Sequence, residues 1–496
     1  MTNQMKKWGY ISMILCCMGM TFGCASNQEP RQALPSEALE ADAPKVITTC
    51  ATDESKPSEQ KIPAQYTDDW SALKQASQSD HSYAYQDGKV YFRQYHADSF
   101  EEGAVWGHYA PIAGTTKEMV CIDADGQMTT LFSDQGFGDF YLIGSRFYMM
   151  EKHITYENDV KRVRDRLYSV DMQGEHRSEY GEGEICAVDL DRAILILKLF
   201  SEETGEAVYN VLDCKQDTLT EIAHDPSNEL IFWEYQDGWC YFDRHTEEVC
   251  HVTAISLDGA YNEIVALAPS EAALEYGYSE DLWGMKVAGD RIYMKYGSYA
   301  GSAAMYQDGR IITTKLDGTD YRGIECGADC FMVCSEAGRP LVYFPECVAD
   351  NGDPYATGVW DLENNTILTS DFPYQLIYEY QEQRVPVYRK EDRSYLMCER
   401  NGAFYGVFSD SAQIVRLADE MNQEIGQRAE VDWQWEQAPF SYHHIYYADG
   451  FLYFEVEMNR YDDTYAVGWR DGYRRVQTNL YRRNLSDGTM ELLYTY

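Results

Sequence analysis

Short runs of alternating apolar and polar residues, separated by tight turn sequences, recur along most of the chain. The clearest is Tyr83–Phe92, in which two such runs flank Asp87-Gly88. Phe232–Phe242 and Ile445–Phe454 repeat the same arrangement around their own Asp-Gly pairs. Alternation of this kind indicates half-buried β-strands. Asp-Gly between two strands favours a two-residue turn, because both central residues need positive φ. The pattern therefore predicts a series of β-hairpins.

A second type of hairpin follows each copy of the first. It has an apolar strand, a polar turn and a strand ending in Leu or Ile, with its clearest turns at Asp125, Asp258, Asp317 and Asp487. Two hairpins supply the four strands of one propeller blade. The paired units cover 82–134, 137–180, 184–223, 230–267, 284–325, 329–370, 375–418 and 443–495. The sequence thus predicts an all-β fold, a β-propeller of eight four-stranded blades. Pro386 lies within a presumed strand of the seventh unit, so seven blades is the alternative.

The N-terminal residues have the pattern of an export signal. Lys6 and Lys7 precede an apolar run from Trp8 to Gly23, and Cys24 follows. A basic segment before an apolar one of this length is typical of a secretory signal peptide. The residues around Cys24 resemble the lipobox of bacterial lipoproteins. This resemblance implies that residues 1–23 are removed and that lipid on Cys24 holds the protein on the cell membrane, facing outside the cytoplasm. An ordinary cleaved signal or an uncleaved anchor is the alternative.

Residues 24–80 are expected to form a flexible tether, which leaves residues 81–496 for the propeller. The tether segment mixes Pro, Ser and acidic residues with little apolar periodicity, so it offers little surface for a core. Its composition matches that of a spacer between a lipid anchor and a folded domain. No function beyond spacing is assigned to it.

Composition narrows the classes of partner. The chain has 82 acidic and 41 basic residues, a formal charge of −41, and 14% aromatic residues, including 41 tyrosines. A strongly acidic protein has no excess of cations to neutralise phosphates, so nucleic acid is excluded as a partner. The aromatic content is too high for a disordered chain. A folded, acidic, aromatic-rich protein remains.

Cysteines and acidic turns are the candidates for a metal site. Cys326, Cys330 and Cys334 form the one cysteine cluster. It is compatible with a metal site, a disulfide or small buried core residues, of which the core is favoured because the surrounding pattern reads as a strand. Asp123–Gly126 and Asp350–Asp353 have a partial calcium-loop pattern without the remaining ligands. The sequence therefore predicts no metal or other cofactor, with calcium at an acidic turn as the alternative.

The Tyr-x-x-Asp-Gly-x-x-Tyr-Phe segments, such as Tyr83–Phe92, resemble the Tyr-rich blades of bacterial secreted propellers that are similar to the low-density-lipoprotein-receptor propeller. The resemblance covers residues 82 to 496. It implies a fold and no particular activity.

Loop length predicts which face binds a ligand. If the strands of a blade are A to D, the A–B and C–D turns lie on one face, and the B–C and D–A connections lie on the other. The long insertions are all of the second kind, at 96–118, 153–165, 268–283, 297–306, 420–442 and 458–477. Long loops on a rigid scaffold commonly carry function. The candidate ligand-binding residues in them are Trp106, His108, Tyr109, Trp283, Tyr299, Trp433, Trp435, Tyr461 and Trp469.

These aromatic residues and the carboxylates beside them suit a glycan, peptide or protein partner, through stacking and cation–π contacts. The sequence contains no metalloprotease, nucleophile-elbow, phosphate-loop or dinucleotide motif, so no catalytic residue is named. A surface-tethered binding propeller is the favoured function. The alternatives are a glycan-active hydrolase or lyase and a structural lipoprotein of envelope assembly. A cluster of His, Arg and Glu in the central funnel, with strongly shifted pKa values, would favour the enzyme. A broad aromatic patch without such a cluster would favour binding.

Overall fold

The structure, a computed structural model, describes residues 46–47, 57–75, 82–96, 116–134, 137–157, 160–201, 203–246, 249–269, 280–300, 305–326, 330–336, 338–346, 356–381, 387–388, 395–428, 440–461 and 473–495. The described chain is mostly β, as the sequence predicts. Its strands form sheets whose neighbours are nearly all antiparallel and consecutive in sequence.

The first half of the chain contributes three sheets. The first contains β4 (Tyr83–Gln86), β5 (Lys89–His96), β6 (Thr116–Asp123) and β7 (Met128–Asp134). The second contains β8 (Phe137–Ile143), β9 (Arg146–Glu157), β10 (Val160–Asp171), β11 (Ser178–Asp189), β12 (Ile194–Phe200), β13 (Ala207–Asp213) and β14 (Thr218–Asp225), and β27 (Val387–Tyr388) joins it. The third contains β15 (Leu230–Gln236), β16 (Trp239–His245), β17 (Cys250–Ser256) and β18 (Tyr261–Leu267), with β1 (Val46–Ile47) beside β18.

The second half contributes four more sheets. The fourth contains β19 (Glu280–Ala288), β20 (Arg291–Ala300), β21 (Met305–Lys315) and β22 (Arg322–Glu325). The fifth contains β23 (Met332–Glu336), β24 (Arg339–Glu346), β25 (Ala356–Asp361) and β26 (Thr366–Ser370), with β2 (Pro57–Ile62) beside β26. The sixth contains β28 (Tyr395–Arg400), β29 (Ala403–Phe408), β30 (Gln413–Ala418) and β3 (Gln65–Thr67), and the seventh contains β31 (Ser441–Ala448), β32 (Phe451–Tyr461), β33 (Tyr473–Asn484) and β34 (Met490–Thr495).

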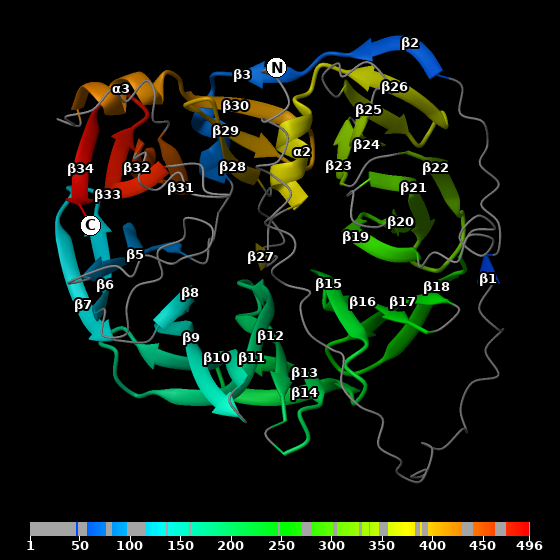
Figure 1. Ribbon diagram of the computed structural model, residues 1–496, viewed down its shortest axis with the longest axis horizontal. Coiled ribbons are helices and arrows are strands. Elements are labelled where there is room, and N and C mark those ends of the chain that lie inside the picture. The colour runs from blue at the N-terminus through cyan, green and yellow to red at the C-terminus, as the bar shows by residue number, and fades with distance from the viewer. Residues whose placement is uncertain are drawn as a thin grey trace.

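The sheets follow one another in chain order around a common centre (Figure 1). In β19–β22 and β31–β34 the first strand lies toward the centre and the fourth toward the outside (Figure 1). Hydrophobic clusters fill the spaces between neighbouring sheets. One of them joins the first sheet to the last, where the Tyr83 and Tyr446 rings stack with their centroids 5.3 Å apart. Each sheet therefore buries apolar residues of both faces against its neighbours.

Tight turns connect the first strand of a sheet to the second, and the third to the fourth. Asp87, Asp237 and Asp449 have φ between 48° and 53°, and the glycine after each also has positive φ, which confirms the predicted Asp-Gly hairpins. The two turns of one sheet lie side by side, since the Leu257 N–H donates to the Gly238 carbonyl at 3.1 Å. We call this side of the sheets the turn edge. The opposite side, which carries the second-to-third connections and the links between sheets, is the insertion edge.

The expected tether over 24–80 is wrong in its C-terminal part. β2 pairs in parallel with β26, and β3 pairs in parallel with β30. A 3-10 helix at Trp70–Gln75 follows, and its Leu73 is fully buried in a cluster with residues of the sixth and seventh sheets. The local sequence pattern misses these strands because their pairing partners lie more than 300 residues away in the chain. The folded body therefore begins before residue 81.

The sequence pattern also predicts that residues 376–388 form the first hairpin of the seventh unit, and this prediction is wrong. Tyr374–Gln381 forms the helix α2, which buries Leu376 and Ile377 in the core. β27 follows and pairs in parallel with the end of β11, near the centre of the ring of sheets (Figure 1). β3 supplies the fourth strand of the sixth sheet instead. A second helix, α3 (Met421–Arg428), follows β30.

Cys330 and Cys334 lie buried in a hydrophobic cluster of the fifth and sixth sheets, in agreement with the core interpretation of the cysteine cluster. Among the residues described, neither helix is long and apolar enough to cross a membrane.

Glu399, in β28, is expected to reduce stability at neutral pH. Burial raises the pKa of its carboxyl, and the hydrogen bond from the Gly402 N–H offsets this in part. When a folded-state pKa is raised, the unfolded chain ionises first as the pH rises, so folding loses stability between the unfolded and the folded pKa. We expect Glu399→Gln to leave the free energy of unfolding, measured with urea, unchanged below about pH 4 and to increase it at pH 7. An equal effect at both pH values would contradict this assignment.

Candidate functional site

Most of the predicted binding residues lie outside the described residues. These are Trp106, His108, Tyr109, Trp433, Trp435 and Trp469, and the predicted lipidation site Cys24 lies there too. The structure therefore does not bring them together or separate them.

Three predicted binding residues are described, and all three lie in strands rather than in loops. Trp283 is in β19, half-buried near the insertion edge, where its indole Nε1 donates to the Gly297 carbonyl at 3.0 Å. Tyr299 is in β20 and Tyr461 in β32, each within its hairpin ladder. The loop placement of these three residues is wrong because the hairpins continue further than the apolar alternation indicated.

These extended hairpins are a feature of the insertion edge. β9 and β10 pair without interruption from Arg146 and Asp171 to Glu157 and Val160. The β20–β21 pair continues to Ala300, and the β32–β33 pair to Tyr461. All three are second-to-third connections, so they lengthen the same edge of three different sheets. The described turns on the other edge are short, which makes the two edges structurally unequal.

A compact polar group lies at the insertion edge of the third sheet. Asp243 and His245 are two residues apart near the end of β16, so their side chains share one face. His245 lies directly opposite Cys250, the first residue of β17, in the antiparallel register. The His245 Nε2 is 2.9 Å from the Asp243 Oδ2, and the Cys250 Sγ is 3.9 Å from the same oxygen. We call these three residues the β16–β17 triad.

Two residues from other strands complete the surroundings of the triad. The Trp233 Nε1 of β15 donates to the Asp243 Oδ1 at 2.5 Å. The Asp281 Oδ1 of β19 lies 3.6 Å from the His245 Nδ1. The triad therefore lies at the junction of the third and fourth sheets. Asp243 and Cys250 are buried, whereas the His245 side chain is 30% exposed.

The fourth sheet places further charged groups at the same edge. Arg310 of β21 pairs with Glu280 of β19 at 2.9 Å, and the Glu280 side chain is only 1% exposed. The Arg310 guanidinium lies 5.3 Å from the centre of the Tyr296 ring. The Lys295 Nζ, from a fully buried side chain, donates to the Cys326 carbonyl at 3.3 Å. A buried charge is costly unless it is paired or hydrogen-bonded, and these contacts supply Glu280 and Lys295 with partners.

The environment sets the protonation of the triad. The hydrogen bond to Asp243 raises the pKa of His245, and burial opposes this rise. Burial raises the pKa of the Cys250 thiol, and the nearby carboxylates of Asp243 and Asp281 add to the effect. A reactive cysteine needs a lowered pKa and access to solvent, and Cys250 has neither. The triad is therefore unsuited to nucleophilic catalysis by the thiol.

The sequence analysis did not single out the triad. The sequence does contain a pattern that could indicate the triad, since Asp-x-His ends one strand and Cys begins the next. Recognising it required the register that places His245 opposite Cys250. A periodicity argument that ignores pairing across the hairpin does not supply that register.

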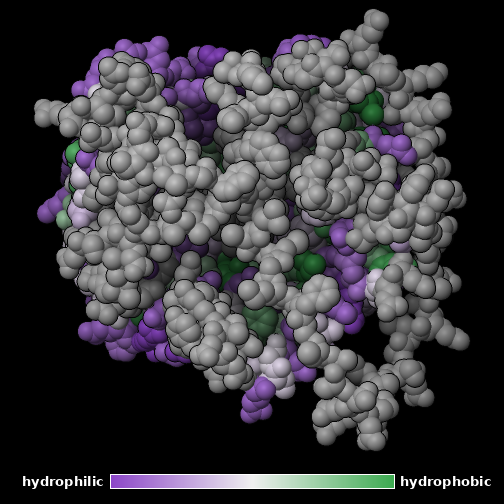
Figure 2. Space-filling view, in the orientation of Figure 1, coloured by the Kyte–Doolittle hydropathy of each residue, from purple (hydrophilic) through white to green (hydrophobic). Residues whose placement is uncertain are grey.

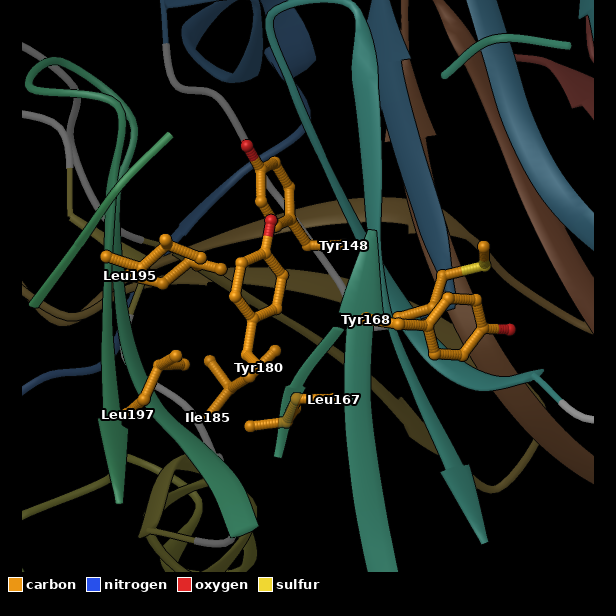
Figure 3. A pocket seen from close by; sticks show the side chains of 9 residues that line it. Tyr148, Leu167, Tyr168, Tyr180, Ile185, Leu195 and Leu197 are labelled. Carbon is orange, nitrogen blue, oxygen red and sulfur yellow. The ribbon is translucent and has the colours of Figure 1, made fainter. Parts of the chain in front are cut away.

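An apolar gap elsewhere in the fold is a packing feature. It lies among β9, β10, β11 and β12, and Figure 3 shows the Tyr148 and Tyr180 rings beside Leu167, Ile185 and Leu195. The two rings stack with their centroids 6.3 Å apart. The gap is too small for any ligand larger than water.

The described part of the surface is mostly hydrophilic in the view of Figure 2, where hydrophobic colour is confined to small patches.

Proteins similar to this chain are found among solved structures and not among family models or curated sequences. No protein-family model matches the chain, and no curated protein matches it in sequence. An acylaminoacyl peptidase from Pyrococcus horikoshii is similar over 72% of this chain, with 12% identity and a TM-score of 0.38. The match covers 52% of the peptidase, so this chain spans about half of that protein's length.

Two further solved structures are similar at the same low level. The β-propeller domain of the Trilobed protease from Pyrococcus furiosus matches 72% of this chain and 97% of its own, with 11% identity and a TM-score of 0.36. A chain of a nidogen/laminin complex matches 48% of this chain and 76% of its own, with 11% identity and a TM-score of 0.23. The similar structures thus include a β-propeller domain. At these scores they add nothing on function.

Proposed function

We propose that this protein is an extracytoplasmic binding propeller, held on the cell membrane by lipid on Cys24, that binds a glycan, peptide or protein partner at its insertion edge. The observation that carries this proposal is the inequality of the two edges. Extended hairpins of three sheets project from the insertion edge, and tight turns close the other. Binding residues concentrate on long connections held by a rigid scaffold.

The proposed propeller has eight blades. The second sheet counts as two blades, because β11 pairs with β10 through Ser178–Glu182 and with β12 through Gly183–Asp189. Each of the other sheets has one run of four strands, which β3 completes in the sixth. Packing of Tyr83 against Tyr446 supports a ring closed between the first and last blades.

The binding proposal is tested with the full chain in detergent, against a glycan array and immobilised peptides and proteins of the cell envelope. We expect Trp433→Ala with Trp435→Ala to weaken binding of the ligand so found by at least about fivefold, or about 1 kcal/mol, a loss that fewer than a third of interface residues exceed. Tyr261→Ala is the matched control, because Tyr261 is an exposed aromatic residue beside the turn edge. Equal losses in both variants, or a loss only in the control, would refute the assignment of the binding edge.

The proposed lipid anchor has its own test. Cys24→Ala is expected to abolish metabolic labelling with a fatty acid and to release the protein from the membrane fraction, since acyl chains supply the membrane affinity. Unchanged labelling and membrane retention would refute lipidation at Cys24.

A glycan-active enzyme is the second candidate. It is favoured by two groups of charged residues at the insertion edge, the pair of Asp243 with His245 and the pair of Glu280 with Arg310. If the array identifies a glycan, release of reducing ends or of unsaturated products on incubation with the protein distinguishes a hydrolase or a lyase from a binding protein.

A further inference from the structure

The β16–β17 triad joins an imidazole, a thiol and a carboxylate at one point. Within the described chain, Asp243, His245 and Cys250 are the group of three such residues whose potential ligand atoms all lie within 4.8 Å of one another. We propose that they bind one divalent transition-metal ion, with zinc as the best match. This proposal is independent of ligand binding at the insertion edge.

The spacing of the donor atoms fits a tetrahedral ion after small adjustments. Bonds of about 2.0–2.3 Å place tetrahedral ligand atoms roughly 3.3–3.8 Å apart. The Asp243 Oδ2 lies 2.9 Å from the His245 Nε2 and 3.9 Å from the Cys250 Sγ. Side-chain shifts of about 0.5 Å therefore bring these separations to tetrahedral values. The backbone register of β16 and β17 already places all three residues together.

The residues around the triad can orient its side chains for metal binding. A metal-bound imidazole donates its other N–H to a carboxylate or carbonyl, which fixes the ring and its tautomer. The Asp281 Oδ1 lies 3.6 Å from the His245 Nδ1, so a small side-chain shift would let this carboxylate accept that hydrogen bond. The Trp233 indole N–H occupies the Asp243 Oδ1 and so orients the Oδ2 of the same carboxylate toward the other two donors. Trp233 and Asp281 come from β15 and β19, strands other than those that carry the three ligands.

The donor set selects the class of ion. Thiolate and imidazole suit zinc and other borderline metals, whereas calcium and magnesium require oxygen ligands. Binding breaks the Cys250 S–H bond and forms an S–metal bond, and the proton passes to solvent. The Asp243–His245 hydrogen bond is replaced by one bond from each residue to the ion. The proton of that hydrogen bond leaves the His245 Nε2, to solvent from an imidazolium ring or by exchange to Nδ1 in a neutral ring, so that Nδ1 carries the single remaining proton. No electron is transferred.

Three protein ligands leave one position of a tetrahedral ion open. Structural zinc sites have four protein ligands, whereas three with an open position are found where the ion contacts water or a substrate. The exposed part of the His245 side chain gives solvent access to the triad, while Asp243 and Cys250 are buried. We therefore expect water or an anionic ligand at the fourth position. Because Asp281 belongs to β19, the ion also links the third sheet to the fourth.

The test uses the full chain in detergent, stripped with a chelator and dialysed against Zn²⁺ or Co²⁺. We expect one equivalent of tightly bound zinc, and with cobalt the sulfur-to-metal charge-transfer band and tetrahedral d–d bands. Cys250→Ala is expected to abolish the charge-transfer band and to lower zinc affinity at least 100-fold. Cys240→Ala is the matched control, because Cys240 is a buried cysteine of the same hairpin that is not part of the triad.

His245→Gln provides a second variant in case Cys250→Ala fails to fold, since His245 is partly exposed and its loss opens no cavity in the core. It is expected to weaken zinc binding while retaining the cobalt–thiolate band with altered d–d bands. Asp281→Asn is expected to weaken zinc binding roughly tenfold, because it removes the carboxylate that would orient the metal-bound His245 ring. Absence of bound metal in the wild-type protein, or identical zinc binding by wild type and both triad variants, would overturn the proposal.

Discussion

Removal of residues 1–80 is expected to destabilise the protein severely, whereas removal of residues 1–44 is expected to have little effect. The longer deletion takes away β3, the fourth strand of the sixth sheet, whose Tyr66 pairs with Ile414. It also removes β2, whose Ile62 carbonyl accepts hydrogen bonds from the Ser370 hydroxyl at 2.9 Å and the Asp371 N–H at 3.1 Å. Buried backbone groups left without partners lower stability by about 1–3 kcal/mol each.

Substitution of Leu73 measures how much the apolar packing of the N-terminal segment contributes to stability, separately from the pairing of β2 and β3. It is fully buried among residues of the sixth and seventh sheets. Leu73→Ala is expected to lower the free energy of unfolding by about 2–5 kcal/mol, the range for a buried leucine. Urea unfolding of the two truncated proteins and this variant gives the measurement. If the 1–80 deletion were as stable as the 1–44 deletion, the parallel pairing of β2 and β3 would have no energetic role.

The sequence predicts those parts of this fold that depend on local pattern. Asp87-Gly88 and Asp237-Gly238 form turns with positive φ, because the geometry of a two-residue turn is a property of the residues in it. The order of the consecutive antiparallel strands follows in turn, since such strands are usually neighbours, whereas the places of β1, β2, β3 and β27 do not.

The parts that sequence reasoning missed depend on distant partners. Pro57–Ile62 has no apolar alternation, and it becomes a strand because the edge of β26 is open to pairing. Tyr374–Gln381 is rich in residues that favour strands, yet it forms a helix that buries Leu376 and Ile377. Tertiary context commonly outweighs propensity in this way. The sequence analysis missed the β16–β17 triad for a related reason, because its residues come together only through the register of the hairpin.

Arg310→Met is expected to lower the free energy of unfolding by about 3–5 kcal/mol, because it leaves the Glu280 carboxylate buried without its cation. The Glu280 side chain is 1% exposed, and Arg310 lies 2.9 Å from it. Methionine retains much of the packing against the Tyr296 ring, so the loss reports mainly on charge. Asp281 follows Glu280 directly and adds a second negative charge at the same edge.

Glu280→Gln in the Arg310→Met background is expected to recover most of this loss, because a neutral amide is less costly to bury than a carboxylate that has lost the Arg310 cation. Urea unfolding of the wild type, both single variants and the double variant gives the coupling free energy of the pair. A single-variant loss below about 1 kcal/mol would place the pair among exposed ion pairs, which contribute little. A double variant as stable as the wild type would instead mean that the insertion edge holds a buried ion pair that adds no net stability. Natural proteins retain such arrangements mainly at functional sites, so this measurement also bears on whether the junction of the third and fourth sheets carries a function.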